Sequence, residues 1–330
     1  MQEGPDDLAR LIHEALEELA WKADAEQVAE IVRRLNVGLP AEDEFMVVSN
    51  WLGKCNMIHK LDQHLVPMQA REKYQVPDLL ARYSTQSNAT PVLIEVKAKQ
   101  AKTLSFQPGY LTRLQAYAEM MAMPLLIAWK FHSIWMLFEP RHMKKAKKNF
   151  NISLSDAMRE NLFGILAGDF AFKVAHGAGA HLCFRKEKLL STIKGDDTFE
   201  ETWQTRCVAV TFTGRGGSVA EKVSPEVQTL LATWDLETTE EHDEDHIWIR
   251  HTAPSEGMRF SHSALVSLLN WGLPQGESIS WREQLRTEKI NTIADFRSAT
   301  VKGLEEGIVH LIVDQQPHTW PDFVRRTQAA

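Results

Sequence analysis

The sequence predicts an α/β protein built on a mixed β-sheet flanked by helices, with an additional C-terminal α+β domain. Two observations predict the sheet. Residues 76–99 contain two apolar segments separated by a polar stretch of turn-forming residues, which is typical of two strands joined by a turn. A helical pattern over residues 108–123 and apolar segments over residues 124–131 and 133–138 follow, so two further strands complete the mixed sheet. Residues 56–66 alternate well enough for a first strand, which would pair with the one that starts at Pro77.

Three polar residues stand out in the two strands. Asp78 lies where the first strand begins, and Glu95 and Lys97 lie two positions apart in the second. Because side chains alternate along a strand, Glu95 and Lys97 share one face. Two carboxylates and an ammonium group inside an apolar sheet are unfavourable unless something binds there. A divalent cation held by the two acids, with the lysine beside a water molecule, would account for all three.

The arrangement Pro77-Asp78, hairpin, Glu95-Val96-Lys97, followed by a helix and a strand, resembles the PD-(D/E)XK nuclease superfamily. This superfamily includes many restriction enzymes and the archaeal Holliday-junction resolvases, and the likeness covers residues 40–140. The resemblance implies a restriction endonuclease-like fold and a nuclease that hydrolyses phosphodiester bonds, with DNA as the expected partner.

The resemblance also implies a role for each residue of the motif. Asp78, Glu95 and the backbone carbonyl of Val96 would hold Mg²⁺, or Mn²⁺ in its place, because hard cations prefer oxygen ligands. Lys97 would orient the attacking water and stabilise the charge of the transition state, or it would lose its proton and act as a base. Whether one metal ion or two are bound is left open.

Residues 40–51 predict a helix, because Pro40 stands in its first turn with acidic residues directly behind it. In the superfamily, a helix ahead of the first strand often carries another acid that reaches the metal. Glu44 is the candidate, since apolar residues one and two turns later share its face. The alternative is that Glu42, Asp43 and Glu44 only complement the helix dipole.

Positive charge is concentrated in one part of the chain. The whole chain has a net charge of −7, yet residues 97–194 hold 16 basic and 6 acidic residues, and the basic residues are densest over residues 141–148. A basic zone beside an acidic site is expected where a protein contacts phosphates. The alternative is a solvated linker with incidental lysines. The candidate nucleic-acid-binding residues are Lys99, Lys102, Arg113, Gln115, Lys144, Lys145, Lys147 and Lys148.

Length and composition indicate an ordinary globular protein of two domains, with 330 residues of which 44% are hydrophobic and 25% charged. We expect a helical segment over residues 1–38, a nuclease core over residues 39–150 and an α+β domain over residues 151–330. Three scattered cysteines favour a reducing compartment. The sequence has neither an apolar run of membrane-spanning length nor a signal-like N-terminus, so we expect a cytoplasmic protein without a membrane partner.

The C-terminal domain is less informative. Its expected elements are a hairpin over residues 168–186, a solvated acidic loop over 237–245, strands over 206–213, 246–251 and 308–313, and helices over 225–234, 261–271 and 292–306. The domain is a candidate for DNA recognition, for homodimer formation or for binding a partner protein. A module that binds nucleic acid or protein without cutting, and a plain structural protein, remain alternatives to a nuclease. Restriction, defence against mobile elements and repair are all compatible settings.

Overall fold

The computed structural model describes residues 40–62, 67–84, 91–194, 199–271, 281–284 and 293–324, together with Leu16, Glu18 and Ile279. The helical segment predicted over residues 1–38 falls outside this description, apart from Leu16 and Glu18, which are helical. The chain forms two compact units. The first comprises Met1–Asp169, Ser280–Thr287 and Gln315–Ala330, and the second Phe170–Ile279 and Glu288–Asp314.

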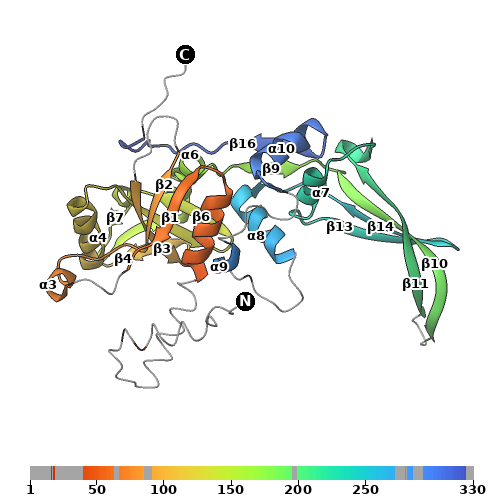
Figure 1. Ribbon diagram of the computed structural model, residues 1–330, viewed down its shortest axis with the longest axis horizontal. Coiled ribbons are helices and arrows are strands. Elements are labelled where there is room, and N and C mark those ends of the chain that lie inside the picture. Colours follow the sequence, from red (N-terminus) through yellow and green to blue (C-terminus); the bar gives the residue numbers. More distant parts are fainter. Residues whose placement is uncertain are drawn as a thin grey trace, which may run out of the picture. The chain divides into compact units, whose positions relative to one another are not determined.

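The first unit contains a five-stranded sheet in the order β1-β2-β3-β5-β6 (Figure 1). Its strands are β1 (Cys55–Lys60), β2 (Leu79–Tyr83), β3 (Pro91–Ala98), β5 (Leu125–Phe131) and β6 (Ile134–Phe138). β3 and β5 are parallel and the other neighbours are antiparallel. The predicted mixed sheet is therefore confirmed, although β1 is shorter than the strand expected there.

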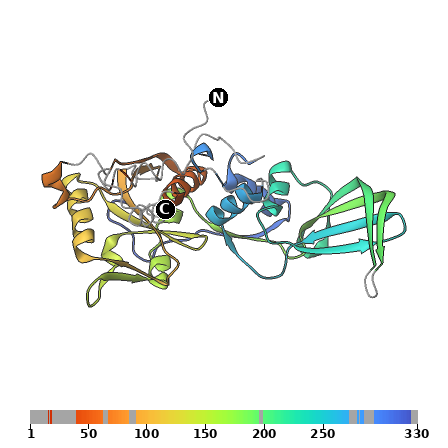
Figure 2. The ribbon, with the colours of Figure 1, turned by 90° about the horizontal axis from the view of Figure 1, so that it is seen from below.

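Helices cover both faces of this sheet (Figures 1 and 2). On one face, α4 (Pro108–Met120) buries Leu111 and Leu114 in a cluster that includes Trp129 and Met136 of the sheet. On the other face, Phe45 of the helix over residues 40–51 contacts Trp135 at 5.0 Å between ring centroids. Because adjacent strand residues point to opposite faces, the neighbours Trp135 and Met136 pack against different helices.

A smaller sheet in the order β4-β8-β7 belongs to the same unit. Its strands are β4 (Thr103–Phe106), β7 (Lys144–Lys145) and β8 (Phe150–Ser153). The turn between β7 and β8 is closed by a 2.7 Å hydrogen bond from the amide of Ala146 to the carbonyl of Asn149. The four lysines of the basic run, Lys144, Lys145, Lys147 and Lys148, therefore lie in a short hairpin of the first unit, the basic hairpin.

The division between the units falls after Asp169, whereas the sequence placed it after residue 150. The intervening chain contains α5 (Leu154–Arg159) and α6 (Phe163–Ala167). It is joined to the large sheet because the amide of Leu162 donates to the carbonyl of Leu137, at 2.6 Å. The amide of Leu137 in turn donates to the side chain of Asn161, at 2.8 Å. The short elements η1 (Pro140–His142), α3 (Met68–Arg71) and α9 (Trp281–Gln284) complete the first unit.

The second unit is α+β, as predicted. A five-stranded antiparallel sheet contains, in spatial order, β12 (Val219–Ala220), β11 (Phe199–Thr213), β10 (Gly179–Lys194), β14 (His246–Thr252) and β13 (Glu237–His242). β14 pairs with β10 only as far as Arg185, so the far ends of β10 and β11 continue as a two-stranded ribbon (Figures 1 and 2). A three-stranded sheet contains β15 (Arg259–Phe260), β9 (Ala171–Val174) and β16 (Val309–Val313). The helices are η2 (Arg215–Gly217), α7 (Pro225–Leu231), α8 (Ser261–Trp271) and α10 (Phe296–Glu305).

Two predictions for this unit are wrong. Residues 168–186 do not form a hairpin, because β9 pairs with β15 and β16 while β10 pairs with β11 and β14. Residues 237–242 are a strand rather than a loop; all six are exposed, and acidic residues are well suited to such a sheet edge. No helix in the described part of the chain is long and apolar enough to cross a membrane.

Candidate active site

The register of β2 against β3 brings Asp78 and Glu95 together. Leu79 pairs with Ile94, so Asp78, one residue before the strand, lies opposite Glu95. Asp78 Oδ2 accepts a 2.6 Å hydrogen bond from the backbone amide of Val96. Opposed residues of an antiparallel pair present their side chains on the same face. The two carboxylates therefore converge on the face of the sheet that α4 covers.

Glu95 is completely buried, with 0% of its surface exposed. Its Oε1 accepts hydrogen bonds from the ammonium of Lys97 and from the hydroxyl of Tyr110, in the first turn of α4. Its Oε2 is buried without a hydrogen-bond partner among the described residues. Burial, reinforced by repulsion from Asp78, raises the pKa of Glu95 to about 7. An unpaired carboxylate oxygen beside a second carboxylate is an arrangement that a cation would satisfy.

Lys97 is held beside this carboxylate but reaches solvent, with 36% of its side chain exposed. Burial by itself would lower the pKa of Lys97, yet attraction to Glu95 and then to Asp78 outweighs it and raises the pKa above its ordinary value. The side chain therefore stays positively charged. This favours charge stabilisation and water orientation, rather than proton abstraction, as the chemistry available to Lys97.

The helix over residues 40–51 presents two acids in different settings. Glu44 Oε1 accepts a 2.9 Å hydrogen bond from the indole of Trp135, and Oε2 pairs with Lys130. Glu42 forms a 2.8 Å ion pair with Lys60. Burial, followed by repulsion from Asp78, raises the pKa of Glu42 to about 7. Glu42 is therefore a second candidate for the helix acid near Asp78, whereas both oxygens of Glu44 already have hydrogen-bond partners.

A divalent cation fits the carboxylate pair by the chemistry of its donors. Asp78 and Glu95 offer oxygen atoms, and Glu95 Oε2 is left without a hydrogen bond from any described residue. No group of three or more His, Cys, Asp or Glu side chains in the described ranges is already assembled as a metal cage. Hard cations such as Mg²⁺ commonly use one or two carboxylates and keep several waters, so a pair is sufficient.

The basic hairpin belongs to the small sheet whose strand β4 leads into α4. Lys145 and Phe106 both pair with Phe150, on opposite sides of β8. Phe106 lies two residues before Pro108, the first residue of α4, and its ring lies 5.9 Å from that of Tyr110, which contacts Glu95. Lys145, Lys147 and Lys148 are exposed, and Lys144 is 77% exposed with Asp156 3.4 Å away.

The remaining basic candidates are distributed around α4. The guanidinium of Arg113 extends back toward the first turn of the helix. Its Nη1 lies close to Gly109, 3.8 Å from the position that a Cβ atom would take on that glycine. Lys99 and Lys102 are exposed in the connection between β3 and β4. The carbonyl of Lys102 accepts a hydrogen bond from the amide of Leu154. Lys102 therefore lies directly before the start of β4, whereas Phe106 lies at its end.

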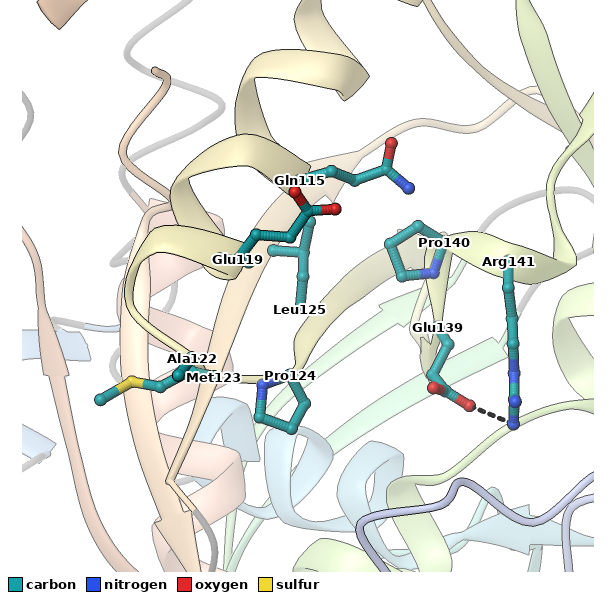
Figure 3. A pocket seen from close by; sticks show the side chains of 10 residues that line it. Gln115, Glu119, Ala122, Met123, Pro124, Leu125, Glu139, Pro140 and Arg141 are labelled. Carbon is teal, nitrogen blue, oxygen red and sulfur yellow. Dashed lines mark ion pairs between the residues drawn. The ribbon is translucent and has the colours of Figure 1, made fainter. Parts of the chain in front are cut away.

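Gln115 lies farther from the carboxylates. It is exposed, and it follows Tyr110 by five residues, a rise of about 7.5 Å along an α-helix. It lines an open pocket of about 490 Å³ with Glu119, Glu139 and Arg141, at the C-terminal part of α4 (Figure 3). Glu139 and Arg141 form a 2.6 Å ion pair there. Gln115 therefore lies beside this pocket, more than one helical turn along α4 from Tyr110.

Sequence reasoning did not single out Tyr110, which donates to Glu95, or Glu42, whose pKa is raised in part by Asp78. Tyr110 stands in the first turn of the helix that follows the lysine strand, and no sequence motif marks it. Glu42 and Glu44 are two residues apart on one helix, about 200° around its axis, and both precede apolar residues at helical spacing. The sequence alone offered no signal that separates them.

Comparisons with known proteins support the predicted likeness of this core to nucleases. Residues 68–166 match the family model of the archaeal Holliday junction resolvase, Hjc. A similar solved structure is Hjc of Archaeoglobus fulgidus, a Holliday junction resolvase from an archaeal hyperthermophile. It is 21% identical, covers 36% of this chain and 91% of its own, and has a TM-score of 0.30. No curated protein sequence matches. The matched segment contains Asp78, Glu95 and Lys97, so the predicted likeness to PD-(D/E)XK nucleases of the resolvase type is confirmed for the core.

Proposed function

We propose that the Hjc-like core is a Mg²⁺-dependent nuclease that hydrolyses phosphodiester bonds in DNA, with branched DNA as its substrate. The observation that carries this proposal is the setting of Glu95. Its carboxylate is completely buried opposite Asp78, one oxygen has no hydrogen-bond partner among the described residues, and an ammonium lies alongside. A buried charged group of this kind is unfavourable in the absence of a bound cation.

The residues of the chain have separate tasks in this reaction. Asp78, Glu95 and the carbonyl of Val96 would hold Mg²⁺, with Mn²⁺ able to substitute, and Glu42 would assist from the helix in place of Glu44. The cation supplies a Lewis acid that polarises a phosphate oxygen and lowers the pKa of a bound water. Lys97, kept positively charged by Glu95 and Asp78, stabilises the negative charge that develops on the phosphoryl oxygens.

DNA would approach from the side where α4 begins. The exposed lysines belong to the β7–β8 hairpin, whose strand β8 pairs with β4, the strand that leads to Tyr110, and Arg113 extends toward the same turn. These cations would bind phosphates and position the duplex without reading its sequence. The branched substrate is proposed from the family match, because the matched family consists of resolvases of Holliday junctions.

The test is cleavage of a four-way junction, a linear duplex and a single strand at several Mg²⁺ concentrations. Asp78→Asn and Glu95→Gln preserve shape and remove one negative charge each, so both should lose at least about 10²–10³-fold in rate. Glu119→Gln, on the exposed side of α4, is the matched control and should cleave normally. Wild-type turnover by Glu95→Gln would refute the proposal. Junction binding without cleavage by the wild type, at any Mg²⁺ or Mn²⁺ concentration, would instead favour a non-cleaving binding module.

A further inference from the structure

The two oxygens of Glu95 have different surroundings. Oε1 receives two donors, the Lys97 ammonium and the Tyr110 hydroxyl, whereas Oε2 receives none from the described residues. We propose that Tyr110 is a positioning residue that holds the Glu95 carboxylate in one orientation, so that Oε2 alone is presented to the cation. This inference rests on the proposed function of the site and extends it to a residue outside the acid–acid–lysine motif.

The backbone that carries Tyr110 is well fixed. α4 begins with Pro108, whose ring already has the φ angle that a helix requires. The amides of Tyr110 and Leu111 both donate to the carbonyl of Gln107, at 3.1 Å. Leu111 is 2% exposed and anchors this turn in the apolar core. The phenol therefore reaches Glu95 from a turn whose position is set by packing.

Lys97 alone would hold the carboxylate less firmly. Its ammonium ends a flexible four-carbon chain that is 36% exposed. The terminal torsion of a glutamate side chain is broad, so a carboxylate held only by a mobile ammonium can rotate. The ring of Tyr110 is rigid, with the ring of Phe106 5.9 Å away and the Lys97 ammonium 5.5 Å from its centre. Hydrogen bonds from such neighbouring residues orient metal-binding carboxylates in many proteins.

The consequence is a specific defect when only the hydroxyl is removed. Tyr110→Phe keeps the ring, its packing on Phe106 and its approach to Lys97, but it frees the carboxylate to turn. We expect the Mg²⁺ concentration that gives half of the maximal rise in melting temperature to increase about tenfold or more, as is usual when the hydrogen-bond partner of a metal ligand is removed. This measurement uses the full-length protein without DNA, so it does not depend on cleavage.

Tyr117→Phe is the matched control. It removes the same hydroxyl from the same helix, where the ring of Tyr117 packs against the apolar core cluster. Its Mg²⁺ midpoint should equal that of the wild type. In a junction-cleavage assay, Tyr110→Phe should require correspondingly more Mg²⁺ for half-maximal rate, and saturating Mg²⁺ should restore most of the rate.

Three outcomes would overturn the inference. A Tyr110→Phe protein with the wild-type Mg²⁺ midpoint shows that the hydroxyl does not orient the carboxylate. A lower melting temperature without Mg²⁺, together with an unchanged midpoint, assigns Tyr110 a purely structural role. A wild-type protein whose melting temperature does not respond to Mg²⁺ or Mn²⁺ removes the proposed metal centre and this inference with it. Only the last outcome also counts against the proposed function.

Discussion

The two five-stranded sheets of this protein place similar residues in opposite environments. In the sheet of the first unit, five consecutive residues of β3 and five of β5 are buried, and Glu95 is 0% exposed. In the sheet of the second unit, all six residues of β13 are exposed, and Glu241 pairs with Arg250 at 3.2 Å while 62% of its side chain reaches solvent. The interaction between Glu241 and Arg250 is an ordinary surface pair of little energetic weight.

A polar residue therefore carries different information in the two sheets. At an exposed edge, acids keep the strand soluble and discourage pairing with other strands, so their presence calls for no ligand. In the buried sheet, the same side chain raises the free energy of the folded state unless a partner compensates. Burial that leaves an oxygen without a partner, rather than residue type or spacing, separates the candidate catalytic acid Glu95 from a surface acid.

The largest effect expected from this contrast concerns Lys97. Lys97→Met should reduce the junction-cleavage rate at least about 100-fold, because it removes a cation next to the developing phosphoryl charge. DNA affinity should change little, since one ammonium is a small share of the total phosphate attraction. Lys186→Met, in β10 of the other sheet, is the matched control and should cleave at the wild-type rate. An equal loss of cleavage rate in both variants would show that Lys97 has no special role in the reaction.

The next effect is on stability as a function of pH. The pKa of Glu95 is raised by burial from about 4.5 to about 7, so the folded state retains a proton that the unfolded state has released between these values. Stability without metal should fall as pH rises through this window and level off above pH 7. Glu95→Gln removes the effect, and at pH 8 it should be more stable by on the order of 3 kcal/mol.

Chemical denaturation at pH 5 and pH 8, in the presence of a chelator, measures this difference. Glu241→Gln should change stability by no more than about 0.5 kcal/mol at either pH, as is usual for an exposed site. With Mg²⁺ present, the order should reverse, because the cation stabilises the ionised carboxylate of the wild type. A Glu95→Gln protein that is less stable than the wild type at pH 8 without metal would show that Glu95 is compensated by the protein itself.

The basic hairpin should affect binding rather than chemistry. Replacing Lys144, Lys145, Lys147 and Lys148 with glutamine should weaken DNA binding and reduce the dependence of log affinity on log salt, by up to about 0.9 for each phosphate that is no longer neutralised. The cleavage rate at saturating DNA should remain near that of the wild type. The four-arginine variant keeps the charge and should keep the salt dependence. An unchanged salt dependence in the glutamine variant would place the DNA path on another surface.

The smallest effect distinguishes the two acids of the first helix. Glu42→Gln should raise the Mg²⁺ midpoint of the melting transition several-fold, up to about tenfold, because Glu42 interacts with Asp78. Glu44→Gln should leave that midpoint unchanged and lower stability, because Lys130 loses its charged partner. The reverse result would restore Glu44 as the helix acid of the metal site.

Much of the core could be predicted from the sequence because its signals are local. Alternation and apolar runs predicted β2, β3, β5 and β6, and helical spacing predicted α4. The same alternation placed Glu95 and Lys97 on one face, and the short hairpin connection brought Asp78 opposite Glu95. Each of these features depends on residues that are close together in the chain.

The remaining features depend on residues that are distant in the chain. β9 and β10 read as a hairpin, yet β9 takes its partner β16 from residues 309–313. Which of Glu42 and Glu44 faces Asp78 depends on the packing of a helix on the sheet, which is set by contacts such as Phe45 with Trp135. Sequence alone determined that two acids and a lysine lie in a buried sheet. Tertiary packing decided that Tyr110 holds one oxygen of Glu95 and that the other is left for a cation, because the rotation and position of a helix are set by side chains from the whole core.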